Sequence, residues 1–96
     1  MIKVIKNDNV ITISGHAGYQ DFGKDIVCAS VSSIIYTTIN AIARINKDAL
    51  EVEDSKKMVI KVLLKDEIVS ILIINMMELL SSLANDYPKN IQVKES

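Results

Sequence analysis

Two side chains in this sequence could together perform covalent chemistry: the single histidine, His16, and the single cysteine, Cys28. A cysteine thiolate is a strong nucleophile, and a histidine can take the thiol proton and later return it to a leaving amine. One histidine and one cysteine are too few ligands for a zinc site, so we expect no metal and no other cofactor. The pair therefore indicates thiol chemistry, provided that the fold brings the two side chains together.

Each residue of the pair also has an ordinary structural interpretation. A lone cysteine near the start of an apolar helix is often a small buried hydrophobic residue, and a lone histidine is often structural or at the surface. A reactive thiol could also sense redox state instead of cleaving a substrate, because a low thiol pKa promotes oxidation too. The residue types alone leave these alternatives open.

The segment between Gly15 and Asp25 must position the pair, and its composition favours a loop. Its glycines supply backbone freedom and leave room for a substrate backbone to approach the sulfur. Its two aromatic residues could bind a substrate or could close the loop onto the core. The candidate substrate-binding residues of this loop are Gly18, Tyr19, Phe22 and Gly23.

A helix is predicted to follow this loop, from Ile26 to Asn46, with Asp25 as its N-cap. Capping suits Asp25 better than the role of a third catalytic residue. Cys28 would then be the third helical residue, where unpaired N–H groups and the macrodipole lower the pKa of a thiol and could form an oxyanion hole. Ser32, one turn further, could bond near the sulfur, although a bond back to its own helix is commoner.

The rest of the chain predicts an α+β fold in the order ββαββαβ, with a mainly antiparallel sheet and two helices in a single compact domain over residues 1–96. No linker of Pro, Ser or charged residues divides the sequence. The expected elements are a hairpin of Ile2–Ile5 and Val10–Ile13, a hairpin around the turn Asp54-Ser55-Lys56, a helix over Asp66–Asp86 that ends before Pro88, and a short strand at Ile91 and Val93.

Composition narrows the possible partners. Lys and Arg number 11 against 12 Asp and Glu, which disfavours direct nucleic-acid binding. The longest aliphatic stretch, Ile71 to Ile74, is too short to span a bilayer, and one cysteine suits a reducing cytoplasm. The second helix is apolar on more than one face, so we expect a homodimer. The segment Gly18–Asp25 resembles a phosphate-binding loop, but Asp25 replaces the Ser or Thr that holds magnesium, which disfavours a nucleotide site.

The segment Gly15-His16-Ala17-Gly18-Tyr19, followed by Gly23, Asp25-Ile26-Val27-Cys28-Ala29 and Val31-Ser32, resembles the signature of the ribosomal-processing cysteine proteases of bacteria, the Prp family. The element order and the length agree with that family from end to end. The motif region is the specific part of the likeness, since the C-terminal half agrees in pattern only.

The resemblance implies an endopeptidase with Cys28 as nucleophile and His16 as its base. It also implies a ribosomal protein substrate, large-subunit protein twenty-seven, from which a short N-terminal extension is removed during ribosome assembly. A homodimer and a mobile loop over about residues 17–24 belong to the same expectation. The alternative from another class is a non-catalytic ribosome-assembly or peptide-binding module that captures a peptide on a strand edge.

Overall fold

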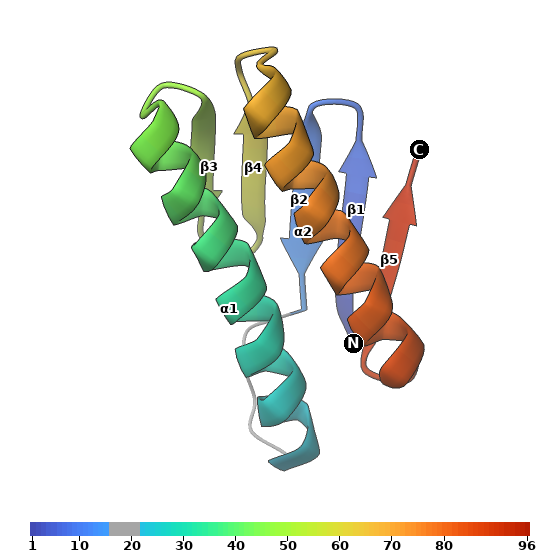
Figure 1. Ribbon diagram of the computed structural model, residues 1–96. Helices are drawn as coiled ribbons and strands as arrows, with labels where there is room; N and C mark the ends of the chain where they lie inside the picture. The colour runs from blue at the N-terminus through green and yellow to red at the C-terminus, as the bar shows by residue number, and fades with distance from the viewer. Residues whose placement is uncertain (16–21) are drawn as a thin grey trace.

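The structure is a computed structural model that describes residues 1–15 and 22–96, and for residues 22–25 it describes the backbone alone. The strands in this part of the chain are β1 (Ile2–Asn7), β2 (Val10–Ser14), β3 (Leu50–Asp54), β4 (Met58–Val62) and β5 (Ile91–Glu95). They form a single sheet in the order β3-β4-β2-β1-β5 (Figure 1). The β1–β2, β2–β4 and β3–β4 pairs are antiparallel, whereas β5 joins β1 in parallel.

The first hairpin forms because aliphatic and polar side chains alternate along both of its strands. The aliphatic side chains of Val4, Ile11 and Ile13 are buried on the helix-covered face. Asp8 lies in the turn with a φ of 56°, a left-handed conformation that Asp tolerates better than most residues. The register set by this turn places Val4 opposite Ile13.

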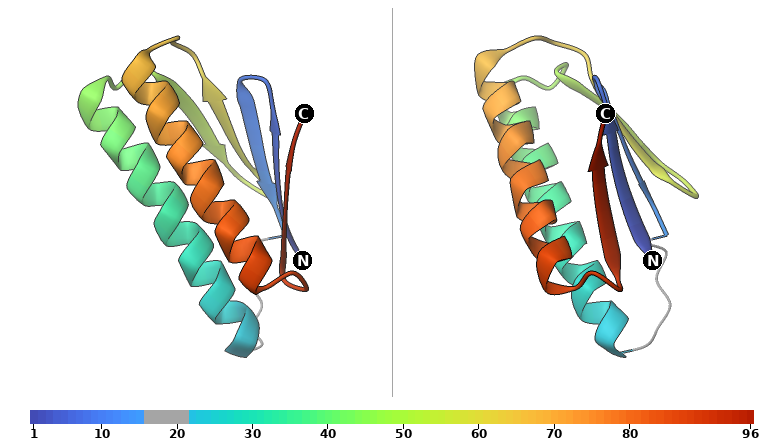
Figure 2. Two further views of the ribbon diagram at one scale, coloured as in Figure 1. Left: turned by 45° about the vertical axis from the view of Figure 1, so that its right-hand side comes forward. Right: turned by 90° about the vertical axis from the view of Figure 1, so that its right-hand side faces the viewer.

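Two helices, α1 (Phe22–Ile45) and α2 (Glu67–Asp86), lie side by side over one face of the sheet (Figure 2). Each is long and apolar enough to cross a membrane by length and composition alone, a test that core helices of globular domains also pass. Here both helices use an aliphatic stripe to cover the sheet. The buried apolar side chains of the helices, as far as the structure describes them, are Val27, Val31, Ile35 and Ile42 on α1, and Val69, Ile73, Met76, Met77 and Leu80 on α2.

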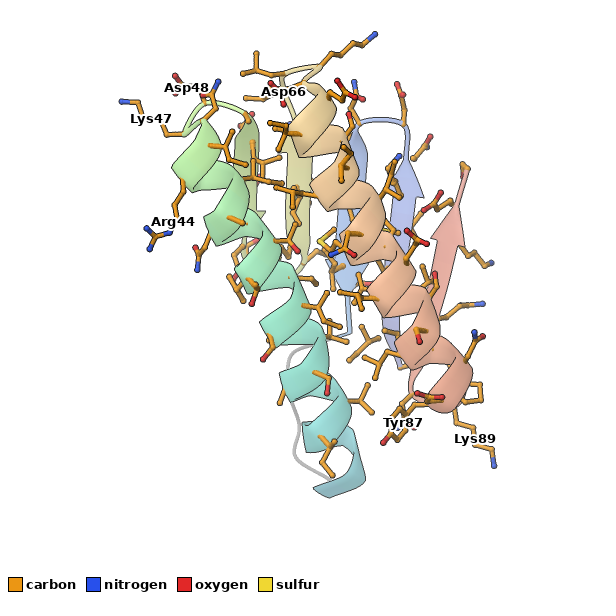
Figure 3. All side chains as sticks on the ribbon, in the orientation of Figure 1. Arg44, Lys47, Asp48, Asp66, Tyr87 and Lys89 are labelled. Atoms are coloured by element: carbon orange, nitrogen blue, oxygen red, sulfur yellow. The ribbon has the colours of Figure 1, made fainter. Side chains whose placement is uncertain are left out.

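The two ends of α2 follow ordinary capping rules. Asp66 is extended, and its Oδ1 accepts the backbone N–H groups of Ile68 at 2.8 Å and Val69 at 3.1 Å. At the other end, the N–H of Tyr87 donates to Leu83 O, and Pro88 then prevents the helix from continuing. Figure 3 shows Asp66 and Tyr87 at these opposite ends.

The predicted α+β fold is confirmed: the element order is ββαββαβ and the sheet is mainly antiparallel. Both hairpins, the second helix and the last strand lie where the pattern predicted them. The stretch from Ile68 to Ile74, which taken alone could also form a buried strand, is helical. One boundary was wrong, the start of α1, and it bears on the site.

Candidate active site

The turn that leads out of β2 requires a glycine. Gly15 has a φ of +75°, and a Cβ atom built on it would lie 2.2 Å from the carbonyl oxygen of Met1. That oxygen belongs to the backbone, so it cannot move aside as the end of a flexible side chain can. Gly15 therefore fixes the path by which the chain leaves the sheet immediately before His16. His16 itself lies outside the described residues, as do Gly18 and Tyr19.

Helix α1 begins at Phe22, one turn earlier than the Ile26 predicted from the sequence. Asp25 therefore lies inside the helix and is not its N-cap. Gly23, which the loop prediction assigned to irregular structure, is helical too, at a propensity cost of about 1 kcal/mol relative to Ala. The substrate contacts predicted for Phe22 and Gly23 lie outside what the structure describes.

This earlier start changes the local setting of Cys28. Counted from Phe22, Cys28 is the seventh helical residue and not the third. Only the first four N–H groups of a helix lack a helical acceptor, and the effect of the macrodipole on charge falls off within the first turn. The prediction that Cys28 lies in the first turn of the helix, among its unpaired N–H groups, is therefore wrong, and an oxyanion hole made by such groups stays a prediction.

Cys28 lies at the boundary between the core and the surface. Its half-buried side chain packs against the main aliphatic cluster, next to the buried side chains of Val27 and Val31. Ile26, by contrast, is 61% exposed. The packing thus holds one side of the Cys28 side chain, which stays partly exposed.

A small cavity lies along α1 on the same helical face as Cys28. Its α1 residues Val31, Ser32, Ile35 and Tyr36 stand three, four, seven and eight positions after Cys28, which is the spacing of one helix face. The sheet closes the other side with Ile13 of β2 and Met58 of β4. The cavity therefore lies between α1 and the end of the sheet that leads to His16.

Ser32 contributes to the mouth of this cavity. Its side chain is exposed, and its hydroxyl makes no hydrogen bond with another described residue. The hydroxyls of Ser30 and Thr38, by contrast, donate to the carbonyl oxygens one turn before them, Ile26 O and Ile34 O. The sequence predicted such a bond back to the helix for Ser32. In the structure Ser30 and Thr38 make this kind of bond, and Ser32 does not.

One hydrogen bond joins Tyr36, a cavity-lining residue of α1, to the end of β3. Tyr36 Oη donates to Oδ2 of Asp54, the last residue of β3, over 2.5 Å. This length is typical of a hydroxyl bound to an ionised carboxylate. The hydrogen bond, together with burial and the negative charge of Asp54, raises the pKa of Tyr36 above its ordinary value of 10.0.

Sequence reasoning missed the cavity-lining residues Ile13, Tyr36 and Met58, and also Asp54, which binds Tyr36. Tyr36 carried a usable signal, because it lies two helical turns after Cys28 on the same face. Asp54 and Met58 carried none, since only the strand pairing of the folded chain brings them near α1. Within residues 1–15 and 22–96, no group of three or more His, Cys, Asp and Glu side chains could hold a metal ion.

Comparison with known proteins gives consistent matches along the chain. Residues 1–92 match the model of the family described as cysteine protease Prp. A relative from Mycoplasma genitalium, named ribosomal processing cysteine protease Prp, is 31% identical over 98 residues, which cover 99% of this chain and 96% of the relative.

Solved structures share the fold. The Prp of Staphylococcus aureus with a covalently linked product peptide superposes with a TM-score of 0.87 at 23% identity, with 100% of each chain covered. The same protease with a substrate peptide gives a TM-score of 0.85 at 19% identity over 99% of this chain and 97% of the other. The protein SMU.848 of Streptococcus mutans gives 0.85 at 24% identity over 98% and 90%.

Proposed function

The chain belongs to the Prp family of ribosomal-processing cysteine proteases, and on this basis we propose that it is the endopeptidase that removes the N-terminal extension of large-subunit ribosomal protein twenty-seven. The observation that carries the proposal is the match over residues 1–92, within which the chain has one cysteine and one histidine. A cysteine protease needs a thiol nucleophile and a base, and Cys28 and His16 are the residues of these types that the chain offers.

The proposed reaction has two halves. His16 takes the proton of the Cys28 thiol, and the thiolate attacks the scissile carbonyl carbon to form a tetrahedral intermediate. The C–N bond then breaks, His16 returns the proton to the leaving amine, and a thioester remains on Cys28. A water molecule, deprotonated by His16, hydrolyses that thioester and restores the thiol.

In the proposed mechanism, Cys28 acts without the help of a helix N-terminus. In the seventh position of α1, its thiol relies on the imidazole of His16 for activation and not on unpaired N–H groups. Gly15 directs the chain from the end of β2 into the segment that carries His16. Asp25 and Ser32 are supporting residues in this proposal. Asp25 lies in the first turn of α1, and Ser32 lines the cavity.

The proposed partner is a ribosomal protein with an N-terminal extension, and the proposed compartment is the cytoplasm, where ribosomal proteins are made. Two likenesses support it. The relative from M. genitalium is named for ribosomal processing, and the S. aureus structures hold a substrate peptide and a covalently linked product peptide. Nucleic acid is not part of the proposed recognition, since the net charge is −1.

A homodimer is proposed for the same chain. The outward side of α2 carries the exposed side chains of Ile68, Ile71 and Leu79, with fractional exposures of 54%, 57% and 47%. Exposed aliphatic side chains gathered on one helix are typical of a surface that another protein covers. Light scattering should give twice the chain mass for the wild type and the monomer mass for Ile71→Glu.

The decisive experiment incubates the purified protein with the precursor of ribosomal protein twenty-seven from the same organism and follows the intact mass of the precursor. We expect one N-terminal peptide to be lost with the wild type and none with Cys28→Ala or His16→Ala. Far-UV circular dichroism of both variants controls for folding. Cleavage by the Cys28→Ala protein would refute the proposal. Binding without cleavage by the wild type would instead favour the non-catalytic peptide-binding module.

A further inference from the structure

The cavity beside Cys28 has the size and lining of a site for an apolar side chain. Its volume is about 40 Å³, whereas a single water needs about 10 to 15 Å³. Ile13, Val31, Ile35 and Met58 supply its aliphatic surface. Water bound there would find few polar partners, so an apolar group is the better occupant.

The position of the cavity relative to Cys28 sets where on a peptide this side chain would stand. An α-helix rises 1.5 Å per residue, so Val31 and Ile35 lie about 5 and 10 Å along α1 from Cys28. An extended peptide advances about 3.3 Å per residue. A peptide running along α1 from the sulfur would therefore bring the side chain two or three residues from the scissile bond to the cavity.

The sheet side of the cavity is one row of paired residues. Met58 pairs with Ile13 of β2 on one side and with Asp54 of β3 on the other. Asp54 ends β3, and β3 is the outermost strand of the sheet at this edge. The position of Met58 over the cavity therefore depends on how firmly the end of this hairpin is held.

On the core side, the buried Met58 side chain holds this end of the hairpin against the helices, and on the outer side the bond of Asp54 to Tyr36 does so. Figure 2 shows the turn between β3 and β4 leaning away from the helix layer. Four of the five β3 residues, Glu51 to Asp54, are exposed. The Tyr36–Asp54 bond is a side-chain hydrogen bond that joins α1 to the sheet. This bond therefore joins α1 to the end of the hairpin that leans away from the helices.

We propose that this cavity binds an apolar side chain of the peptide substrate, two or three residues from the scissile bond, and that the Tyr36–Asp54 hydrogen bond holds the cavity wall in place. The inference rests on the proposed protease function and adds a specificity site to it. Tyr36 and Asp54 act here as positioning residues. They set the position of Met58 and take no part in bond breaking.

The first test separates binding from chemistry with a synthetic peptide that carries the N-terminal extension of the organism's ribosomal protein twenty-seven. Tyr36→Phe and Asp54→Ala should each raise KM about three- to tenfold with kcat unchanged, because the lost bond affects ground state and transition state alike. Asp54→Asn keeps an acceptor oxygen and should retain the wild-type KM. The double variant Tyr36→Phe/Asp54→Ala should be no worse than either single variant.

Matched controls are available in the same chain. Tyr87 and Asp48 lie at opposite ends of the molecule, far from each other, and neither lines the cavity (Figure 3). Tyr87→Phe and Asp48→Ala should leave KM unchanged. Equal KM for all five single variants and the wild type would overturn the positioning role, and so would a loss confined to kcat.

The second test detects occupancy directly. Methionine labelled with 13C at its methyl group reports on Met58 in the cavity and on Met76 in the core, both in the catalytically disabled Cys28→Ser protein. Saturating extension peptide should shift the Met58 methyl signal and leave that of Met76 unchanged. Replacing the peptide's apolar residues with Ala one at a time should abolish the Met58 shift at one position, two or three residues from the cleaved bond.

The outcomes separate this inference from the protease function. If the wild type cleaves the peptide but saturating peptide leaves the Met58 signal of Cys28→Ser unchanged, the side-chain site is wrong and the protease function stands. If the wild type neither binds nor cleaves the peptide, both are wrong. If the Met58 signal shifts without any cleavage by the wild type, the cavity binds peptide and the protease function fails.

Discussion

The two helices of this protein begin in different ways. Helix α2 starts behind Asp66, whose carboxylate accepts two of the helix's first N–H groups, and the chain enters it directly from the β4 hairpin. Helix α1 starts at Phe22 and carries its carboxylate, Asp25, inside the helix. The cap at the start of α2 thus stabilises the helix. The start of α1 follows the segment that carries His16, the base in the proposed mechanism.

The largest effect on folding should come from the turn that leads towards His16. Gly15→Ala places a Cβ against the Met1 carbonyl oxygen in a backbone conformation that L-residues rarely adopt, so we expect a loss of about 1–3 kcal/mol in the free energy of unfolding. Urea denaturation measures it. Proteolysis should fall as well, even where the variant remains folded, because the segment after Gly15 must take another path. Wild-type stability in Gly15→Ala would contradict the geometry of this turn.

The cap of α2 should affect stability without affecting catalysis. Asp66→Ala removes an acceptor from two N–H groups and should cost about 1 kcal/mol, a fall in Tm of about 4–8 °C for a domain of this size. Asp66→Asn retains an acceptor and is the matched control. Below the Tm, peptide cleavage by Asp66→Ala should equal that of the wild type, and a specific loss of cleavage would break the contrast between the two helix starts.

The corresponding change in α1 should be smaller. Asp25→Ala alters a residue inside the helix, where Ala has the higher propensity, so we expect a change in unfolding free energy within about 0.5 kcal/mol. Thermal unfolding of Asp25→Ala and Asp66→Ala under one set of conditions gives the comparison directly. A loss at Asp25 as large as that at Asp66 would restore Asp25 as an N-cap.

The smallest expected effect is a shift in the titration of Tyr36. Its pKa is raised in the folded protein, so the stability contributed by its bond to Asp54 is complete below the unfolded pKa of 10.0 and is lost as the pH rises through the folded value. Ultraviolet absorbance of tyrosinate should show one component that titrates late, and Tyr36→Phe should remove it. Asp54→Ala should move that component to lower pH.

Most of the fold followed from the sequence for identifiable reasons. Alternation predicted the hairpins, Asp66 and Pro88 bounded α2, and Asp8 occupied the turn that its side chain favours. The start of α1 did not follow, because Asp25 has the composition of a cap and Gly23 that of a loop, while the folded chain continues the helix through both.

The site was only partly predictable. The residue types of His16 and Cys28 pointed to thiol chemistry, and their family resemblance supplied the substrate class. The cavity could not be predicted from the sequence, since Met58 lies beside Ile13 through strand register and Asp54 reaches Tyr36 through a hydrogen bond between β3 and α1. Local patterns do not encode such contacts between distant segments.

The most direct test of the proposed mechanism is the mass of the enzyme itself during turnover. Wild-type protein mixed with the ribosomal precursor and quenched in acid should carry the N-terminal extension as a thioester, and fragmentation should place it on Cys28. The Cys28→Ser and His16→Ala proteins should show no thioester. Cleavage of the precursor by the Cys28→Ser protein at the wild-type rate, or acylation at a residue other than Cys28, would contradict the account.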